Sequence, residues 1–467
     1  MNAYSTMNDE ISPRLMQRFD IPGPRYTSYP TADRFLPDAQ GEHLISALRS
    51  RATSAEAMPL SLYVHLPFCE SVCYYCACNK VITKDHGKVD DYLRYLDRET
   101  ALLQPHLGDA HHRQVGQLHL GGGSPTFLDD GELTRLMGLL RERFHFVEGA
   151  ELSIEIDPRT VNTERLVHLR HLGFSRVSFG VQDFDPDVQQ AVHRVQPFEQ
   201  VEALVRDVRR LGFESINLDL IYGLPRQTSE SFRRTVERVL SIEPDRLALY
   251  AYAHLPARFK PQRRIEAAEL PRADDKVAML DQAIRAFMRH GYDYIGMDHF
   301  ALPDDQLAQV KRQGRLQRNF QGYHAHAGVD LLGLGVSSIS QIGVVYSQSL
   351  KTLPDYYAAL DAGHLPVERG LTLDDDDRLR RDVIMALMCQ GRLNFEQIGQ
   401  RHRIDVEHYF ADALARLQEF EREGLVIRSW AGLEVSRTGW FFVRAMAMCF
   451  DKHLNLHHDH QRFSKVL

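Results

Sequence analysis

The chain has 467 residues, of which 43% are hydrophobic, and its formal net charge is −7. This length allows two to four domains, and the hydrophobic content supports a large buried core. The acidic balance disfavours a general polyanion-binding role, so no nucleic-acid partner is expected. No segment approaches the ~18 consecutive apolar residues of a membrane span. The first ten residues have neither a basic start nor an apolar run, and we expect a cytoplasmic protein.

The first predicted element is an N-terminal arm over residues 1–55. Its distinctive part is Pro24-Arg-Tyr-Thr-Ser-Tyr-Pro30, in which two prolines bracket two tyrosines. Proline fixes its own backbone and restricts the residue before it, so this piece should be extended and ordered rather than helical. Two interpretations stay open, a strap over the core or a cover over an active site.

From Ser61 the sequence alternates between short apolar strands and helices with apolar residues three or four positions apart. The strands are predicted at 61–66, 117–121, 151–157, 176–180, 216–222 and 246–252. A glycine followed by an aromatic residue separates a helix from a strand at Gly173-Phe174, Gly212-Phe213 and Gly291-Tyr292. Such alternation predicts a parallel sheet with helices outside it. Six βα units suit an open partial (β/α)6 barrel of the TIM type, with chemistry at the carboxyl ends of the strands.

The composition changes near Leu365, so we predict a catalytic barrel over residues 56–365 and a mainly helical C-terminal domain over 366–467. Four aspartates, Asp374–Asp377, place carboxylates at the positive start of a helix. Shorter helices and a probable hairpin over 425–436 follow, which is a winged-helix-like pattern. Because this domain has more acidic than basic residues, packing against the barrel is favoured over DNA binding.

Three cysteines, Cys69, Cys73 and Cys76, follow the first predicted strand with the spacing Cys-x3-Cys-x2-Cys. Three thiolates on one loop can hold three corners of a cubane iron–sulfur cluster, which leaves the fourth iron open to a small molecule. Cys78 lies close by, so an all-cysteine zinc site is the alternative. Zinc frameworks more often use two separated Cys-x2-Cys pairs, which favours the iron–sulfur interpretation.

The cysteine stretch and the strand before it resemble the radical S-adenosylmethionine (SAM) superfamily. Together with the arm at 24–30, Gly121-Gly-Gly-Ser-Pro-Thr126 and Arg318-Asn-Phe-Gln-Gly-Tyr323, they make nearly the whole chain similar to the oxygen-independent coproporphyrinogen III oxidases. The resemblance implies an open barrel of the radical SAM type. It also implies an enzyme of haem biosynthesis that oxidatively decarboxylates two propionates of coproporphyrinogen III to vinyl groups, giving protoporphyrinogen IX.

The resemblance further implies a [4Fe–4S] cluster on Cys69, Cys73 and Cys76, with Cys78 outside the ligand set. SAM would chelate the open iron, and one electron would release methionine and a 5′-deoxyadenosyl radical. Two propionates need two radicals, so two SAM molecules are expected. The family's SAM-contacting positions correspond to Tyr63, Tyr75, Gly122, Gly123, Ser124, Glu155, Gln182, Arg194, Asp219, Ala253, Phe320, Gln321 and Ile339.

Each of these positions also has a plainer explanation. Tyr63 suits a strand in the core, the glycines at 121–123 suit a tight turn, and Glu155 suits a solvated strand end. The case for a SAM site rests on their joint occurrence.

The resemblance implies further partners, namely an electron donor such as flavodoxin or ferredoxin, and a monomeric enzyme. An alternative function is a haem-binding chaperone on the same radical SAM fold. Related chaperones lack the fourth cysteine and much of the arm, so Cys78 and residues 24–30 favour the enzyme.

Overall fold

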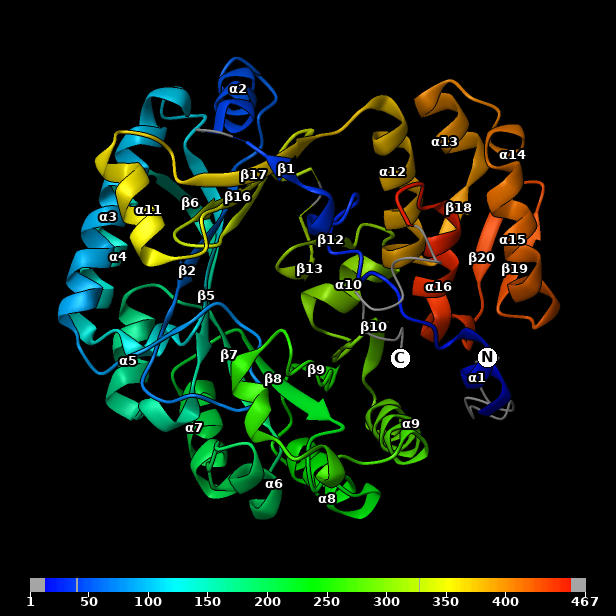
Figure 1. Cartoon of the computed structure of the whole chain (residues 1–467), viewed down its shortest axis with the longest axis horizontal. Coiled ribbons are helices and arrows are strands. Elements are labelled where there is room, and N and C mark those ends of the chain that lie inside the picture. The colour runs from blue at the N-terminus through cyan, green and yellow to red at the C-terminus, as the bar shows by residue number, and fades with distance from the viewer. Residues whose placement is uncertain (1–12, 39–40, 327, 455–467) are drawn as a thin grey trace. The chain divides into compact units, whose positions relative to one another are not determined.

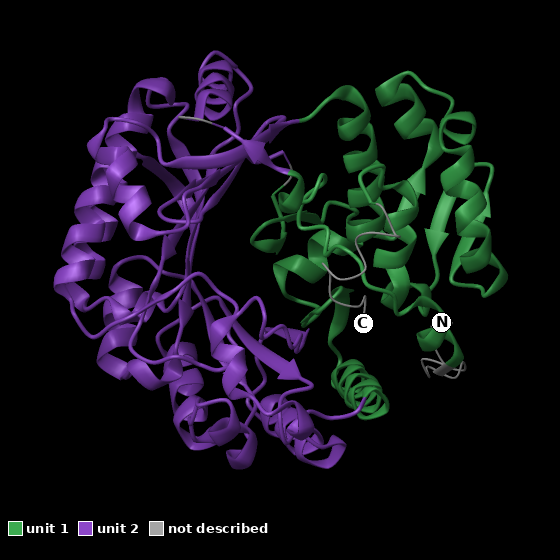
Figure 2. Cartoon of the chain, viewed as in Figure 1, with its two compact units in different colours: residues 1–34, 273–327, 373–467 green, residues 35–272, 328–372 purple. Residues whose placement is uncertain are grey.

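The computed structural model describes residues 13–38, 41–326 and 328–454. The chain forms two compact units, which Figure 2 distinguishes by colour. Unit 1 comprises residues 1–34, 273–327 and 373–467, and unit 2 comprises residues 35–272 and 328–372. The boundaries of these units differ from those of the three predicted domains, and the division into three domains stays a prediction. The first twelve residues of the predicted arm lie outside the described residues.

Unit 2 is built on a parallel sheet whose strands run in the order β14-β2-β5-β6-β7-β8-β9 (Figure 1). Their bounds are β2 (Leu60–Leu66), β5 (Gln114–Gly122), β6 (His145–Ile156), β7 (Arg176–Gln182), β8 (Ser215–Tyr222), β9 (Arg246–Ala251) and β14 (Leu331–Leu334). Antiparallel strands continue beyond β14, namely β15 (Ile339–Ile342), β16 (Val345–Ser349), β17 (Val367–Thr372) and β1 (Leu36–Pro37). All six predicted strands are confirmed, and within the described residues the strand order is linear, as an open barrel requires.

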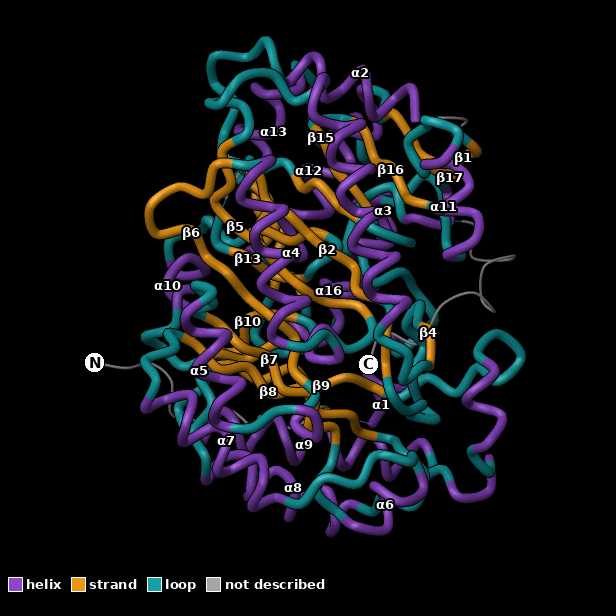
Figure 3. The backbone as a smooth tube through the Cα atoms, turned by 90° about the vertical axis from the view of Figure 1, so that its left-hand side faces the viewer, coloured by secondary structure: helices purple, strands orange, loops and turns teal. Residues whose placement is uncertain are grey.

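Helices join the parallel strands of unit 2 and bury one apolar face each. On α3 (Gly87–Leu103), Val89, Leu93 and Leu96 lie three or four residues apart and are buried, as their spacing predicts. The other helices are α2 (Glu42–Arg51), α4 (Asp130–Arg143), α5 (Thr163–His171), α6 (Pro186–Ala191), α7 (Phe198–Arg210), α8 (Ser229–Ser241) and α11 (Leu353–Asp361). Figures 1 and 3 show α3 and α4 on the outer side of β2 and β5. Across the described part of the chain, no helix has both the length and the apolarity to cross a membrane.

Unit 1 combines helices with small antiparallel sheets. Its helices are α1 (Pro13–Phe19), α9 (Ala273–Arg289), α10 (Gln306–Arg312), α12 (Asp375–Gln390), α13 (Phe395–His402), α14 (Val406–Tyr409), α15 (Ala411–Arg422) and α16 (Val443–Ala447). Its strands are the pairs β10 (Asp293–Gly296) with β11 (His299–Ala301) and β12 (Gln317–Asn319) with β13 (Gly322–His324), and the sheet β18 (Arg392–Asn394), β20 (Gly432–Val435), β19 (Val426–Ser429).

The C-terminal part of unit 1 confirms the predicted helices and hairpin. Asp374 caps α12 through a reciprocal capping box with Asp377, which explains the aspartate run. The third glycine–aromatic repeat leads to β10, which pairs antiparallel with β11, whereas the first two lead to the parallel strands β7 and β8.

The arm at residues 24–30 forms no helix, as its prolines predict, but it is not extended throughout, because Tyr26 has a φ of 45° and the chain bends over residues 27–30. Its two tyrosines, Tyr26 and Tyr29, are fully buried within unit 1. The Tyr26 hydroxyl donates to Asp451 Oδ2 over 3.0 Å, and the backbone N–H of Lys452 donates to the Tyr29 hydroxyl over 3.1 Å. The structure therefore supports the strap interpretation, while a role as a cover over an active site stays a prediction.

A buried carboxyl on α3, Glu99, ties this helix to the end of β14. Glu99 Oε2 accepts hydrogen bonds from the Gly335 N–H over 2.8 Å and from the Tyr356 hydroxyl over 2.7 Å. Burial raises the pKa of Glu99 to about 7, and these two hydrogen bonds offset that effect only in part.

We expect Glu99→Gln to remove a pH dependence of folding stability. Because the pKa of Glu99 is higher in the folded than in the unfolded chain, its contribution is present at low pH and is lost as pH rises from about 4.5 to 7. The free energy of unfolding of the wild-type chain should fall, relative to the variant, by roughly 2 kcal/mol between pH 5 and pH 8. Urea unfolding at both pH values measures this, and Glu142→Gln at an exposed site of α4 is the control. Parallel pH profiles for Glu99→Gln and wild type would contradict the assignment.

Candidate active site

The cysteine loop, residues 68–82, begins where β2 ends and closes on itself. Its two ends form a short parallel pair, β3 (Phe68–Cys69) with β4 (Val81–Ile82). Within the loop the Lys80 ammonium donates to the carbonyls of Cys76 over 3.1 Å and Cys78 over 3.3 Å. This closure holds the predicted cluster cysteines on one short, internally bonded loop.

The cysteine loop is also fixed from outside by three buried polar side chains. The Tyr92 hydroxyl on α3 donates to the His65 carbonyl over 2.6 Å, and the His65 ring contacts the Asn79 carbonyl through Nε2 at 2.9 Å. On the other side, Gln262 Nε2 donates to the carbonyls of Tyr75 over 3.0 Å and Ala253 over 3.2 Å. The loop is thus tied to α3, to β2 and to the segment after β9.

A cavity of about 420 Å³ opens at the carboxyl ends of the parallel strands in unit 2. All four cysteines of the loop line it, which places the three predicted ligands at a common space. The neighbouring Cys78 thiol, with help from the Lys80 ammonium, lowers the pKa of Cys76. Cys78 therefore lies directly beside a predicted ligand.

Eight of the predicted SAM-contacting residues also line this cavity. They are Tyr75, Gly122, Gly123, Ser124, Glu155, Gln182, Arg194 and Asp219. Its described lining does not include Tyr63, Ala253 or Ile339, which lie in the same unit on β2, after β9 and on β15. Phe320 and Gln321 belong to unit 1, where they form the turn between β12 and β13.

The chain at the end of β5 packs closely against the cysteine loop, and this packing requires a glycine at position 123. The Gly123 N–H donates to the Leu66 carbonyl over 2.8 Å, and a Cβ at Gly123 would lie 2.7 Å from the backbone of Pro67. The Gly122 N–H points at Glu155 Oε2 over 3.3 Å. The backbone of this segment thus lies directly against the cysteine loop, and the N–H groups of Gly122 and Gly123 both have acceptors within the protein.

Two carboxylates face the cavity, Glu155 on β6 and Asp219 on β8 with β7 between these strands, and their pKa values are shifted in opposite directions. Burial would raise the pKa of Glu155, but the hydrogen bond from His119 and the Gly122 amide lower it overall. The pKa of Asp219 is raised to about 6 by burial and by the negative charge of Glu155. Glu155 is thus an ionised group that lines the cavity while its side chain stays partly exposed to solvent, and Asp219 can gain or lose a proton near pH 6.

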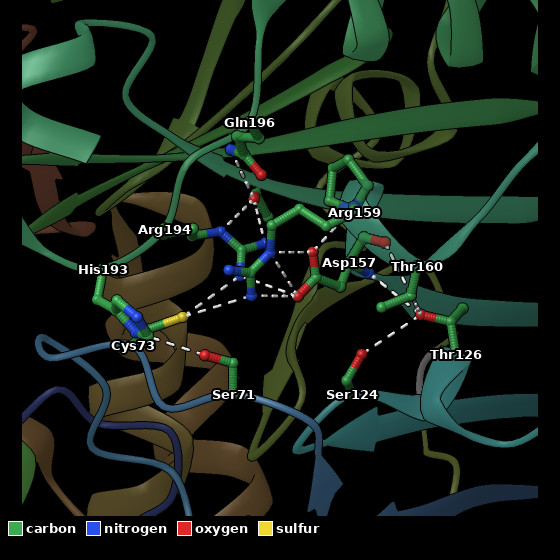
Figure 4. A network of polar contacts seen from close by, with 12 residues as sticks. Ser71, Cys73, Ser124, Thr126, Asp157, Arg159, Thr160, His193, Arg194 and Gln196 are labelled. Atoms are coloured by element: carbon green, nitrogen blue, oxygen red, sulfur yellow. Dashed lines mark hydrogen bonds and ion pairs between the residues drawn. The ribbon is translucent and has the colours of Figure 1, made fainter. Parts of the chain in front are cut away.

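Two arginine side chains contact the cysteine loop at Cys73, as Figure 4 shows. Arg194 Nη1 lies 3.5 Å from the Cys73 sulfur and 3.2 Å from Asp157 Oδ2, and Arg159 Nη2 lies 3.7 Å from the same sulfur. Arg194 also donates to the Gly180 carbonyl through Nε over 3.1 Å and Nη2 over 2.6 Å. Two guanidinium groups thus surround one thiol, and Asp157 balances part of their charge.

A backbone irregularity directs Gln182 into the cavity. The register between β7 and β8 shifts between Gly180 and Gln182, and Gln182 adopts a left-handed φ of 68°. A β-bulge of this kind reorients the side chain at a strand end and is common beside active sites. It explains how a residue at the end of β7 contributes its amide to this cavity.

The cavity is also lined by residues that were not predicted from the sequence as site residues, among them Lys80, Asp157, Arg159, Thr160 and Ser178. Asp157 and Arg159 directly follow β6, at the strand end where the fold concentrates chemistry. Their position was therefore a usable signal, as was the charge of Lys80 within the cysteine stretch. Ser178 offered none, because a serine inside a strand is not distinctive.

We expect Gly123→Ala to displace the cysteine loop. The added methyl would meet the backbone of Pro67 and Phe68 at 2.7 and 2.8 Å, so the loop must move. Overpacking of this kind costs about 1–3 kcal/mol of stability, and iron bound after anaerobic reconstitution should fall. The measurements are iron per chain and urea unfolding.

Gly138→Ala is the matched control for this prediction. Gly138 lies on the exposed side of α4 with nothing within 4 Å of its Cβ position, so alanine should retain iron and add about 0.5–1 kcal/mol of stability. Normal iron content in Gly123→Ala would show that the close approach is not needed for the cluster loop.

Comparisons with known proteins agree with this arrangement. A family model described as the Radical SAM superfamily matches residues 63–239, and one described as the HemN C-terminal domain matches residues 373–442. Proteins named oxygen-independent coproporphyrinogen III oxidase are similar over nearly the full length. The one from Pseudomonas aeruginosa is 49% identical over 97% of this chain and 98% of its own, and the one from Escherichia coli is 45% identical over the same shares.

A solved structure is also closely similar. The coproporphyrinogen III oxidase (HemN) of Escherichia coli, described as a radical SAM enzyme, superposes with a TM-score of 0.89 at 45% identity. The match covers 93% of this chain and 100% of that chain.

Proposed function

This chain belongs to the oxygen-independent coproporphyrinogen III oxidase family of radical SAM enzymes, and from that membership we propose its reaction. It decarboxylates two propionate side chains of coproporphyrinogen III oxidatively, without oxygen, to give the vinyl groups of protoporphyrinogen IX. One observation carries the proposal, namely that Cys69, Cys73 and Cys76 line the same cavity as Glu155 and Arg194. Cluster ligands and groups that can bind a charged cofactor thus share one site.

The family implies a [4Fe–4S] cluster and SAM, and the residues present fit both. Three thiols on one closed loop match a cluster with one open iron, and Cys78 beside Cys76 is a fourth thiol that the cluster does not require. When bound, the cluster and SAM supply a carbon radical that can remove hydrogen from a propionate. The protein's part is to bind, orient and shield these groups.

For the first SAM we assign roles from the charges in the cavity. The ionised Glu155 suits the ammonium group or ribose hydroxyls, and the backbone of Gly122, Gly123 and Ser124 lets the cofactor approach closely. We keep Tyr63, Ala253, Phe320, Gln321 and Ile339 as further proposed SAM contacts.

We propose a second SAM molecule beside the first, since two propionates need two radicals. Gln182, Arg194 and Asp219 lie together in the cavity, and the Tyr75 ring lines it between two cluster ligands. Arg194 donates to groups of the chain through all three nitrogens, so it attracts a ligand carboxylate by its charge, and Asp219 can pair with a cation. These residues supply the charges that a second SAM molecule needs in the same cavity.

We further propose a monomeric, cytoplasmic enzyme that takes electrons from a flavodoxin or ferredoxin. Thiols reserved for iron need a reducing compartment, which supports the location. The alternative of a haem-binding chaperone is not supported, because relatives 45–49% identical over nearly the whole chain are named as the oxidase.

The reaction is tested with anaerobically reconstituted chain, SAM, a reductant and coproporphyrinogen III. Wild type should hold about four irons and form protoporphyrinogen IX, and alanine at Cys69, Cys73 or Cys76 should abolish both. Cys78→Ala should keep its iron, because three thiolates suffice. Iron analysis and chromatographic detection of the vinyl product are the measurements.

Two results would overturn the proposed reaction. Stoichiometric zinc without iron after anaerobic purification would show a structural zinc site. Tight stoichiometric haem binding with no vinyl product would show a carrier. The matched control is Cys389→Ala, since Cys389 is buried in the core of unit 1 and should not affect the cluster.

The second SAM is tested by binding stoichiometry. Holoprotein should bind two SAM molecules, and Gln182→Ala or Asp219→Asn should reduce the number toward one while cluster iron is retained, because neither residue is a cluster ligand. Equilibrium dialysis with labelled SAM gives the count. A single SAM bound by wild type that forms the divinyl product would refute the second site.

A further inference from the structure

Unit 1 gathers three guanidinium groups near one another, those of Arg25, Arg318 and Arg444. Arg318 lies on β12 opposite Tyr323 on β13, with its guanidinium carbon 4.5 Å from the centre of the Tyr323 ring. Arg25 and Arg318 both act electrostatically on Tyr323, and both lower the pKa of Arg444 after burial, to about 9. Like charges are thus concentrated in the interior of one unit.

Two of these arginines have clear partners. Arg444 donates to the carbonyl of Pro24 over 3.1 Å and to that of Gly23 over 2.5 Å, so it anchors the start of the arm. Arg25 forms an ion pair with Asp298. Both therefore have structural roles that account for their positions.

Arg318 is different. It is only 8% exposed, yet its Nε and Nη1 atoms are buried and make no hydrogen bond with any described residue. The ring of Tyr323 offsets part of its charge, but a buried guanidinium usually has a hydrogen-bonding anion. Nε and Nη1 point in different directions, and each can donate a charge-assisted hydrogen bond to an anionic oxygen such as that of a carboxylate.

We propose that Arg318, supported by the charge of Arg25, is a carboxylate-binding site that holds a propionate of the porphyrinogen substrate. This rests on the proposed function, because coproporphyrinogen III supplies the carboxylates. Propionates that the reaction leaves in place suit such a site, since holding them positions the ring without exposing them to the radical. SAM also carries a carboxylate, so the two sources must be separated by experiment.

The test compares Arg318→Gln and Arg318→Lys with wild type in reconstituted holoprotein. Arg318→Gln should raise the KM for coproporphyrinogen III and the Kd for coproporphyrin III, measured by fluorescence, by about tenfold or more, because a charge-assisted hydrogen bond is lost. Arg318→Lys should be intermediate. Cluster iron and the Kd for SAM should stay unchanged. The matched control is Arg315→Gln, which removes an exposed arginine of the same segment whose side chain bonds only to Gln313 among described contacts.

A second variant predicts a gain and remains informative if Arg318→Gln folds poorly. Asp298→Asn removes the carboxylate that neutralises Arg25, so coproporphyrin III should bind several-fold more tightly. A purely structural cluster predicts weaker or unchanged binding.

The outcomes separate the two proposals. Unchanged porphyrin affinity in Arg318→Gln, or a loss of SAM affinity instead, overturns this inference while turnover by wild type upholds the reaction. Wild type that binds coproporphyrin III through Arg318 but forms no vinyl product upholds the site and overturns the reaction.

Discussion

The close approach of Gly123 to the backbone after β2 is the constraint on which the cavity depends. Because Gly123 has no Cβ, its N–H can hydrogen-bond to the Leu66 carbonyl, and the end of β5 can lie against the start of the cysteine loop. Two segments that would otherwise be separate loops become one wall. The carboxyl ends of β6, β7 and β8 then add Glu155, Gln182 and Asp219 to the same space. A backbone fit thus creates the shape, and side chains supply its charge.

Charge in this cavity is arranged in opposed groups. Arg159 and Arg194 contact the Cys73 sulfur, and Asp157 joins them as their shared counter-charge. If Cys73 ligates a cluster, as proposed, hydrogen bonds to its sulfur would be among the features that set the potential of that cluster. Across the cavity Glu155 stays ionised, while burial and the charge of Glu155 raise the pKa of Asp219 to about 6. One side of the site is therefore matched to anionic sulfur and the other to a cationic ligand.

Much of the fold followed from periodicity, and part of the site followed from the spacing of motifs. Alternating strands and helices predicted the parallel sheet, and the cysteine spacing with Glu155 marked positions that do share a cavity. The bulge at Gln182 and the packing of Gly123 could not be predicted, because both depend on backbone geometry set by neighbouring strands. The partners of Arg194 were also hidden, since Cys73 and Asp157 lie far from it in sequence. Asp157 could have been found from its place after β6.

Two buried arginines, Arg194 and Arg318, differ in how their donors are satisfied, and the difference points to where a ligand binds. In unit 2, each guanidinium nitrogen of Arg194 donates to an acceptor of the chain, on Gly180, Asp157 or Cys73. In unit 1, Arg444 likewise uses backbone carbonyls, but Arg318 retains two buried donors without a described acceptor. Leaving such donors unpaired costs about 1–3 kcal/mol. That cost is reasonable where an anion from outside the chain completes the contacts, since the free energy then appears as affinity and selectivity for that anion.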